Sequence, residues 1–445
     1  MLTHAGAHHP DDSNDMTEII DDAEADSVAF ATILSERQVT SVFQPLVDLA
    51  TGEIVGYEAL CRGPEGSRFA SPAQLLHQAE LDGLQSMLNW ICLGSAFEAF
   101  FRAGAPRSAS LFVNVSVGLR IDECPPDIHQ IVARAQSSLR VFIELSDAAL
   151  ASDPQGVLAT VDRARQLGWG VSVDDVSSSP GCLSVLPLLS ADVVKLDMRM
   201  LQRNSPGDFA PSLGPLLKYV ESNSVTLIVT GIETAAETKL ARALGATLGQ
   251  GYRLGKPATL SGPIAAPRAI VPLFGVSRRS RGATVLREIV EEAPSHNMTA
   301  EALLEIGGFF IRQALTARSR PVVLIRHPNG LSLDAVFHVD TLDQLRETAV
   351  LSAVFGPPSV SKVLPGWRHV VVSPGDPLRN QAFLVLLTDS IAVGIVATRW
   401  MPHEDLFDVM LTQDAGTVYR LADHLIRRMP SADGDEIMRF DRGED

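Results

Sequence analysis

Six short apolar runs in the first 250 residues of the chain carry charged or amide residues at or near their ends. These residues are Glu58, Asn114, Glu144, the pair Asp174 and Asp175, Lys195, and Glu233. A strand buried on both faces should be almost continuously apolar, and an unpaired buried carboxylate is costly unless it becomes neutral. Because this free-energy cost recurs on successive runs, we expect the fold to offset the buried charges in one shared site.

The apolar runs alternate with helical patterns. The runs lie at 41–49, 54–62, 111–116, 141–146, 171–176, 193–198, 227–233 and 249–254, and the helical patterns at 72–103, 125–139, 154–167 and 235–244. Thr234 and Glu237 predict a capping box at the start of the last helix. This order indicates βαβ units, either in a closed (β/α)8-type barrel or in an open doubly wound sheet. No G-x-G-x-x-G or Walker loop follows a run, which weakens the second alternative.

In a closed barrel the charged residues would converge at the C-terminal mouth, where such folds carry their chemistry. Their formal charge of −4, which two divalent cations would balance, comes from Glu58, Glu144, Asp174, Asp175, Glu233 and Lys195. Oxygen ligands favour Mg²⁺ or Mn²⁺ over Zn²⁺. Two such ions could clamp the oxygens of a phosphoryl displacement, with Lys195 orienting the water and Arg62 gripping a phosphate.

Each residue also has an ordinary structural interpretation. Glu58 or Asn114 alone in a strand is usually a satisfied hydrogen-bonding group, and Lys195 beside Asp197 could form a structural ion pair. Asp174 and Asp175 could simply end a strand. Taken together at the ends of successive strands, these residues favour a functional site.

Length and charge set the domain organisation. A chain of 445 residues exceeds the size of a single core, so we expect two domains. The net charge of −16 is concentrated at the ends, with −8 in residues 1–28 and −4 in residues 431–445. We therefore expect residues 1–35 to be an acidic disordered segment and residues 431–445 an acidic tail. The acidity argues against binding to a nucleic-acid backbone.

Cysteine spacing and hydropathy indicate the compartment. The four cysteines include no C-x-x-C pair, so neither a zinc site nor a disulfide framework is indicated. The N-terminus lacks the pattern of a signal peptide, and the most apolar stretch, 383–397, is interrupted by Thr388-Asp389-Ser390. We interpret that stretch as two strands and a turn, and expect a cytoplasmic protein without a membrane span.

Residues 263–283 are rich in proline and end in a basic run, which predicts a linker. A mixed α+β domain is predicted over residues 284–430. Its helices are expected at 284–292, 300–317 and 418–429, and its strands at 322–325, 335–339, 369–372, 383–387, 391–397 and 409–411. Pro328-Asn329-Gly330 predicts the turn between the first two strands.

Several motifs of the first domain match those of a known family. They are Phe43-Gln44-Pro45-Leu46, Glu58-Ala59-Leu60-Cys61-Arg62, Asn114-Val115-Ser116, Glu144-Leu145-Ser146-Asp147, Asp174-Asp175, Lys195-Leu196-Asp197, Gly231-Ile232-Glu233-Thr234 and Gly249-Gln250-Gly251-Tyr252. In order and spacing they resemble the EAL-domain cyclic di-GMP phosphodiesterases over residues 36–262. The resemblance implies a modified TIM barrel that binds cyclic di-GMP and, in active members, opens it to linear pGpG with two Mg²⁺ or Mn²⁺ ions.

The resemblance also implies a role for each matching residue. The metal ligands would be Glu58, Asn114, Glu144, Asp174 and Asp175. Lys195 would act on the nucleophilic water, and Asp175 and Glu233 would complete the catalytic group. Gln44, Arg62 and Gln250 would contact the substrate. Asp147 stands where the family has a Glu that steadies the loop after the paired aspartates.

The sequence departs from the family pattern in two places. Thr230 replaces the first glutamate of the E-G-V-E motif, which catalysis needs in active members, and the loop 174–182 loses the Phe-Gly step after its aspartates. A threonine hydroxyl is neutral and short, so a second cation would lose a ligand and a negative charge. We expect retained ligand recognition, one firmly held ion, and weak or absent turnover.

The second domain resembles the DICT sensory domain at Gly375-Asp376-Pro377-Leu378, the strand pair 383–397 and the segment 407–414. A dimerisation or packing module is the alternative interpretation. For the whole chain the first hypothesis is a bacterial signalling protein, expected to be a homodimer, that hydrolyses cyclic di-GMP slowly under control of the C-terminal domain. The second hypothesis is a non-enzymatic cyclic di-GMP receptor, and the third is a partner-binding scaffold.

Overall fold

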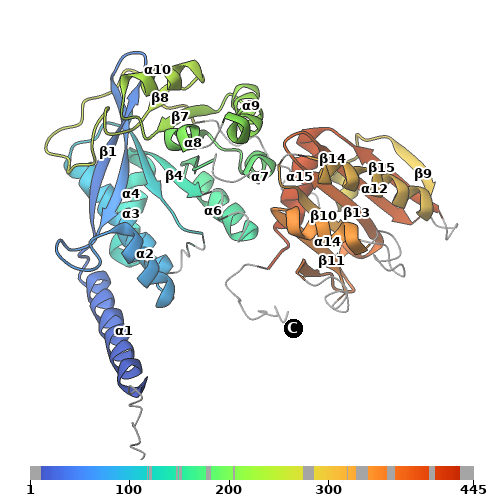
Figure 1. Ribbon diagram of the computed structural model, residues 1–445, viewed down its shortest axis with the longest axis horizontal. Helices are drawn as coiled ribbons and strands as arrows, with labels where there is room; N and C mark the ends of the chain where they lie inside the picture. The colour runs from blue at the N-terminus through green and yellow to red at the C-terminus, as the bar shows by residue number, and fades with distance from the viewer. Residues whose placement is uncertain are drawn as a thin grey trace, which may run out of the picture.

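Eight strands close into a barrel in the first half of the chain (Figure 1). They are β1 (Thr40–Asp48), β2 (Ile54–Arg62), β3 (Ser110–Asn114), β4 (Arg140–Ser146), β5 (Gly170–Asp174), β6 (Val193–Asp197), β7 (Thr226–Thr230) and β8 (Leu248–Gly249). Strand β1 runs antiparallel to both of its neighbours, β2 and β8, whereas the other neighbouring pairs are parallel. Closure confirms the modified barrel and excludes the open doubly wound sheet.

The computed structural model describes most of the chain. The described residues are 12–117, 119, 123–146, 149, 153–176, 182–203, 206–273, 285–317, 319–326, 339–357, 366–399 and 406–430. In these ranges no helix is both long and apolar enough to cross a bilayer.

The barrel interior is filled by apolar side chains below the level of the charged residues. Phe112 and Phe142 stack there with ring centroids 4.6 Å apart and are fully buried. The rest of this inner cluster includes Leu46, Val55, Val193 and Ile228. The strands are buried on both faces, as the near-continuous apolar runs predict.

Helices surround the barrel. They are α2 (Pro72–Leu81), α3 (Gln85–Arg102), α4 (Pro126–Ser138), α6 (Pro154–Gln166), α7 (Cys182–Leu189), α8 (Met198–Arg203), α9 (Pro206–Ser222) and α10 (Ala235–Ala243). The predicted helix 72–103 is two helices, because Gly83 takes a positive φ of 66° between α2 and α3. The capping box of Thr234 and Glu237 is present at the start of α10. Helices α7 and α9 were not predicted, because prolines such as Pro187 obscure their periodicity.

Helix α1 (Asp12–Ser35) covers most of the segment for which the charge pattern predicted disorder. Its C-terminal part packs on α2 and α3, where Phe30 is fully buried against Phe69 with ring centroids 5.7 Å apart. The N-terminal part extends away from the barrel (Figure 1). The density of acids therefore does not prevent helix formation here, because the apolar end of the helix is anchored on the barrel. Residues 1–11 and the acidic tail lie outside the described residues.

The second domain is a seven-stranded mixed sheet in the order β12-β11-β10-β13-β14-β15-β9. Its elements are α11 (Leu286–Ile289), β9 (Ser295–Thr299), α12 (Ala300–Leu315), β10 (Val322–Arg326), α14 (Val339–Thr348), β11 (Leu351–Gly356), β12 (Arg368–Val371), β13 (Gln381–Leu387), β14 (Ala392–Arg399), β15 (Leu406–Thr412) and α15 (Ala415–Ile426). Helices α12 and α14 pack on one face of the sheet and α15 on the other.

The strands predicted at 322–325, 369–372, 383–387, 391–397 and 409–411 are all present. Strand β10 pairs with β11 on one side and with β13 on the other. The expected strand 335–339 and the turn Pro328-Asn329-Gly330 fall outside the described residues, except that Val339 begins α14. Strands β9 and β11 were missed.

The two domains share one continuous apolar cluster, in which α15 contacts α6 and α7. The buried Ser184 hydroxyl on α7 donates a hydrogen bond to the carbonyl oxygen of Arg320 at 2.7 Å, and its oxygen lies 3.1 Å from the Ser319 hydroxyl. Arg427, just after α15, forms an ion pair with Asp162 on α6. The interface therefore combines an apolar cluster with one buried and one partly exposed polar contact.

Candidate active site

The charged residues of successive strands meet at one mouth of the barrel. Glu58 comes from β2, Asn114 from β3, Glu144 from β4, Asp174 from β5 and Lys195 from β6, while Asp175, Glu233 and Gln250 follow the ends of β5, β7 and β8. Register brings Asn114 directly beside Glu144 and Ser146 beside Asp174. The convergence expected from the sequence is therefore present.

Glu58 is the centre of a hydrogen-bonded network. Its Oε2 accepts hydrogen bonds from Lys195 Nζ and Gln250 Nε2, each at 2.8 Å, and its Oε1 accepts one from Asn114 Nδ2 at 3.2 Å. Burial alone would raise the pKa of Glu58, but the charge of Lys195 and these hydrogen bonds outweigh burial, so its pKa is lowered. Glu58 is therefore held as a carboxylate inside the barrel mouth.

Lys195 is the buried cation of the site, with 1% of its surface exposed. It forms ion pairs with Glu58 and Glu144, and its Nζ lies 5.7 Å from the centroid of the Phe112 ring. Burial lowers the pKa of Lys195, but the carboxylates of Glu144, Glu58 and Asp174 more than reverse this effect and raise it. Lys195 therefore keeps its proton.

Glu144 is the least compensated acid of the group. It is 2% exposed, and apart from its ion pair with Lys195 its oxygens have no hydrogen-bond partner among the described residues. Burial raises the pKa of Glu144 well above its ordinary value, and the nearby charges of Glu58 and Asp174 add to that increase. A cation placed beside Glu144 would stabilise its carboxylate form.

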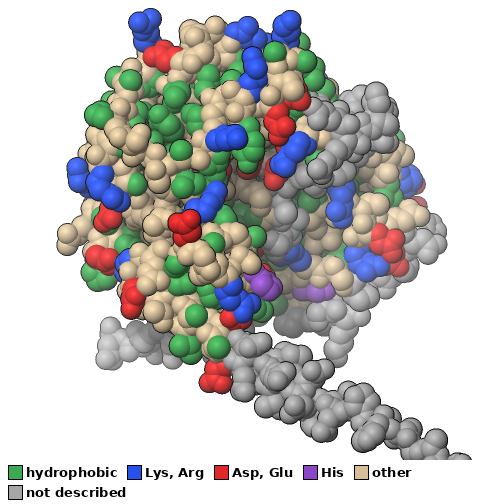
Figure 2. All heavy atoms as spheres, turned by 60° about the vertical axis from the view of Figure 1, so that its left-hand side comes forward, with side chains coloured by type: hydrophobic (Ala, Val, Ile, Leu, Met, Phe, Trp, Pro, Cys, Tyr) green, Lys and Arg blue, Asp and Glu red, His purple; other side chains and the backbone are tan. Residues whose placement is uncertain are grey.

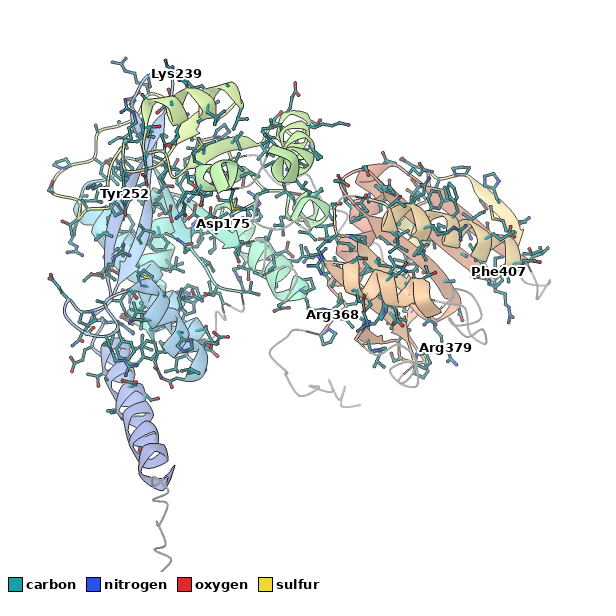
Figure 3. The ribbon with its side chains drawn as sticks, viewed as in Figure 1. Asp175, Lys239, Tyr252, Arg368, Arg379 and Phe407 are labelled. Atoms are coloured by element: carbon teal, nitrogen blue, oxygen red, sulfur yellow. The ribbon has the colours of Figure 1, made fainter. Side chains whose placement is uncertain are left out.

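The paired aspartates leave the barrel wall at the end of β5. Asp174 Oδ1 accepts the backbone N–H of Asp175 at 3.0 Å, and Asp175 takes a left-handed φ of 57°. Burial and the charges of Asp174 and Asp197 raise the pKa of Asp175. Figure 3 labels Asp175 and Tyr252, which both lie on the barrel domain.

Two cavities meet at Glu58. One, of about 380 Å³, is lined by Gln44, Glu58, Asp174, Asp175, Lys195, Asp197, Arg199, Thr230, Gly231, Glu233, Gln250, Gly251 and Tyr252. The other, of about 600 Å³, is lined by Glu58, Asn114 and Glu144 together with mainly apolar residues of β2, β3, α2 and α3. A polar half and an apolar half therefore share one carboxylate, which is an arrangement suited to a ligand with both phosphate and aromatic parts.

Gln44 and Gln250 belong to the polar half. Gln250 is 3% exposed and donates from its Nε2 to Gln44 Oε1 at 3.2 Å as well as to Glu58. Gln44 in turn donates to the carbonyl of Gly255 at 3.2 Å. Glu233 lines the same cavity and is exposed.

One predicted site residue, Arg62, is not gathered into the site. The Arg62 side chain folds back and donates from Nη1 to the carbonyl of Cys61 at 2.7 Å, and it lines neither cavity. Asp147 and residues 177–181 lie outside the described residues. The suggested ion pair between Lys195 and Asp197 is absent, because Asp197 pairs with Arg199.

Arg199 is the site residue that the sequence argument missed. It lines the polar cavity from the start of α8, two residues after Asp197. The sequence did contain a signal for this residue, because Arg199 is basic and lies only two positions after the acidic residue that ends β6. Figure 2 shows basic and acidic side chains interspersed over one face of the molecule, with no large basic patch on that face.

The donor set suits a hard divalent cation, since it consists of carboxylate and amide oxygens. The spacing is not that of a formed metal centre, because within the described ranges no three acidic, histidine or cysteine side chains are close enough to hold an ion. Lys195 separates Glu58 from Glu144 by bonding to both. Glu144 Oε2, which has no hydrogen-bond partner among the described residues, is the observation that fits an added cation.

Comparison with known proteins connects the barrel to a family. The family model described as the EAL domain matches residues 27–257. The probable cyclic di-GMP phosphodiesterase PdeB of Escherichia coli is 26% identical over 228 residues, which cover 50% of this chain and 43% of that protein. A cyclic di-GMP phosphodiesterase of Pseudomonas aeruginosa is 28% identical over 249 residues, covering 54% of this chain and 42% of that protein. The chain thus spans less than half the length of these relatives.

Solved structures also resemble the barrel. An EAL protein of Vibrio cholerae, solved with cyclic di-GMP bound, is 26% identical with a TM-score of 0.43 and covers 51% of this chain and 94% of its own. The Klebsiella pneumoniae protein BlrP1, solved as a manganese and cyclic di-GMP complex, is 19% identical with a TM-score of 0.44 and covers 51% of this chain and 57% of its own. The family match ends before the second domain, which none of these proteins identifies.

Proposed function

The chain belongs to the EAL domain family and is related to cyclic di-GMP phosphodiesterases, and from this we propose that its barrel binds cyclic di-GMP and hydrolyses it slowly to linear pGpG. The observation that carries the proposal is the buried cluster of Glu58, Lys195 and Glu144 at the junction of the polar and apolar cavities. Buried ionisable residues whose pKa values are strongly shifted and which line a cavity are typical of functional sites.

Mg²⁺ or Mn²⁺ is the cofactor that we propose, held by residues of the set Glu58, Asn114, Glu144, Asp174 and Asp175. When bound, the ion would supply positive charge to the phosphate and lower the pKa of the attacking water. The chain itself contributes a protonated Lys195 that can donate to the water or to a phosphate oxygen, and Gln250 and Gln44 hold Glu58 in place. Glu233 and Arg62 are proposed contacts at the rim.

A non-enzymatic receptor is the second candidate, favoured by Thr230. Its neutral side chain lines the polar cavity beside Gly231 and Glu233, where the family pattern has another carboxylate. A receptor would keep the ligand contacts while losing the charge that turnover needs. The second domain is proposed to be a sensory module of the DICT type acting on the barrel.

The test is an incubation of the full-length protein with cyclic di-GMP and either Mg²⁺ or Mn²⁺, with binding followed by calorimetry and pGpG by chromatography. The variant Glu58→Ala removes the central carboxylate, and the control Glu221→Gln removes an exposed acid of α9. We expect binding and slow pGpG formation in the wild type and in the control, and loss of both in Glu58→Ala. Binding without product would select the receptor. Absence of both binding and product in the wild type would reject the proposal.

A further inference from the structure

The acids at the barrel mouth can be divided into two groups according to whether they act on Lys195 or on Arg199. The carboxylates that act on Lys195 are Glu144, Glu58 and Asp174. Those that act on Arg199 are Asp197, Asp175 and Glu233. We call these the inner and the outer group. Each group has three carboxylates and one basic side chain, so each has a formal charge of −2.

Burial separates the two groups. Glu58, Glu144 and Lys195 of the inner group are at most 9% exposed, so water cannot screen their charges. In the outer group Asp197 is 7% exposed but is paired with Arg199, whereas Asp175 and Glu233 are exposed and the side chain of Arg199 is 65% exposed. The excess negative charge therefore needs a bound cation only in the inner group, whereas solvent and Arg199 suffice for the outer one.

The guanidinium of Arg199 is fixed in the outer group by Asp197. Its Nε donates to Asp197 Oδ1 at 3.1 Å and to Oδ2 at 2.9 Å, and its Nη2 lies 2.7 Å from Oδ2. The backbone N–H of Arg199 also donates to Asp197 Oδ1 at 2.8 Å. This fork arrangement holds the positive charge in one place rather than on a freely moving side chain.

The neighbouring strand end is adapted to this arrangement. Thr230 is the register partner of Asp197 across β6 and β7, so it is a neutral residue beside the Arg199–Asp197 pair. The next residue, Gly231, has a positive φ of 71°, and an added Cβ there would lie 3.0 Å from Asp197 Oδ1 and 3.9 Å from Cγ of Arg199. Arg199 thus packs along the end of β7 at the place where this chain lacks a carboxylate.

We propose that Arg199 takes the place of a second divalent cation in the outer group, so that the protein holds one divalent ion tightly and offers a guanidinium to the ligand phosphate at the other position. The phosphate contact of Arg199 rests on the proposed function. The number of tightly bound metal ions does not, because it can be measured without the nucleotide. A fixed guanidinium can bind a phosphate oxygen, yet it cannot generate a hydroxide from a bound water as a metal ion does. The arrangement therefore favours ligand retention over fast turnover.

The experiment is a Mn²⁺ titration of the full-length protein without nucleotide, with free Mn²⁺ read by electron paramagnetic resonance. We expect one tight ion in the wild type. In Arg199→Ser the outer group loses the guanidinium that pairs with Asp197, so a second Mn²⁺ should bind more tightly by on the order of tenfold. Arg199→Lys keeps the charge and should stay close to the wild type. Arg163→Ser removes an exposed guanidinium on α6 and is the matched control.

The inference would be overturned if the wild type bound two Mn²⁺ ions with equal affinity. It would also be overturned if Arg199→Ser bound the second Mn²⁺ with the same affinity as the wild type. Cyclic di-GMP binding to the same variants separates it from the proposed function. A wild type that binds one Mn²⁺ but no cyclic di-GMP would reject the proposed function and leave the metal statement intact. A wild type that binds cyclic di-GMP while Arg199→Ser binds it equally well would reject the phosphate contact.

Discussion

At the scale of single residues, the site depends on how Glu58 shares its two oxygens. It accepts hydrogen bonds from Lys195, Gln250 and Asn114, which belong to β6, the segment after β8, and β3. One carboxylate therefore connects three parts of the barrel mouth. Together with the charge of Glu144, the negative charge of Glu58 keeps Lys195 protonated, and it would attract a cation.

Glu58→Gln tests that charge. The amide is similar in size but neutral, so we expect the affinity for Mn²⁺ to fall by about tenfold or more. A Mn²⁺ titration measures this fall, with Glu221→Gln as the control for loss of a distant acid. Unchanged Mn²⁺ affinity in Glu58→Gln would show that the ion does not bind at the inner group.

Thr230→Glu tests the second departure from the family pattern. The new carboxylate would stand beside Asp197 in the β6–β7 register, and we expect faster pGpG formation because the outer group becomes more negative. Arg199 would pair with the new acid, so the double variant Thr230→Glu with Arg199→Ser should be faster than either single variant. Initial rates of pGpG release measure the effect. Rates equal to the wild type in all three variants would mean that the missing acid does not limit turnover.

At the scale of single elements, α15 joins the sheet of the second domain to the barrel. Val418, Leu421, Leu425 and Ile426 are fully buried, which the predicted helix 418–429 anticipated from its spacing. The same helix carries His424, whose Nε2 is buried without a hydrogen-bond partner in the described part of the chain. Burial lowers the pKa of His424, and the charge of Arg428 lowers it further, while Asp423 and Asp376 oppose the shift.

His424 predicts a pH dependence of folding stability. The pKa of His424 in the folded state lies below the unfolded value of 6.5, so protons bind more readily to the unfolded chain. The contribution of His424 to the free energy of unfolding is therefore complete above that pH and is lost as the pH falls. We expect the unfolding free energy of the wild type, relative to His424→Gln, to decrease as the pH is lowered from 8 to about 5. Urea unfolding at a series of pH values measures it. A difference between the two proteins that stays constant with pH would contradict the assignment.

Some helices and strands could be predicted from the sequence and others could not, for a physical reason. Strands β2 and β4 are recognisable because their apolar runs are local, and α10 because its capping box is local. Helices α7 and α9 were missed because prolines interrupt their pattern, and they are stabilised by packing on the barrel instead. Strand β9 was missed because it is a polar edge strand that is recognised only by its pairing with β15.

At the scale of the whole molecule, the two domains pack through α6, α7 and α15. Helix α7 begins at residue 182, not far along the chain from Asp174 and Asp175, and its Ser184 bonds to the second domain. An apolar interface of this kind favours a fixed arrangement of the domains over free motion. The second domain is therefore in a position to affect the side of the barrel that leads to the paired aspartates.

Arg427→Ala tests the interface. Arg427 pairs with Asp162 on α6 and with Asp423 on its own helix, and each member of the interdomain pair is about one third exposed. We expect a loss of about 1 kcal/mol of interdomain stability. Hydrogen exchange should become faster in α6 and α15. Arg420→Ala, which removes a contact only within α15, is the control, and equal exchange in both variants would contradict the interface.

The sequence by itself determined that acids end successive apolar strands, because strand burial follows from local patterns, and it predicted that these acids would meet if the sheet closed into a barrel. Only the tertiary structure decided which charges neutralise which. Lys195 lies between Glu58 and Glu144 rather than beside Asp197, Asp197 is taken by Arg199, and Arg62 folds onto its own backbone. Such pairings depend on the distances and directions of side chains from different strands, and these are set only when the barrel closes.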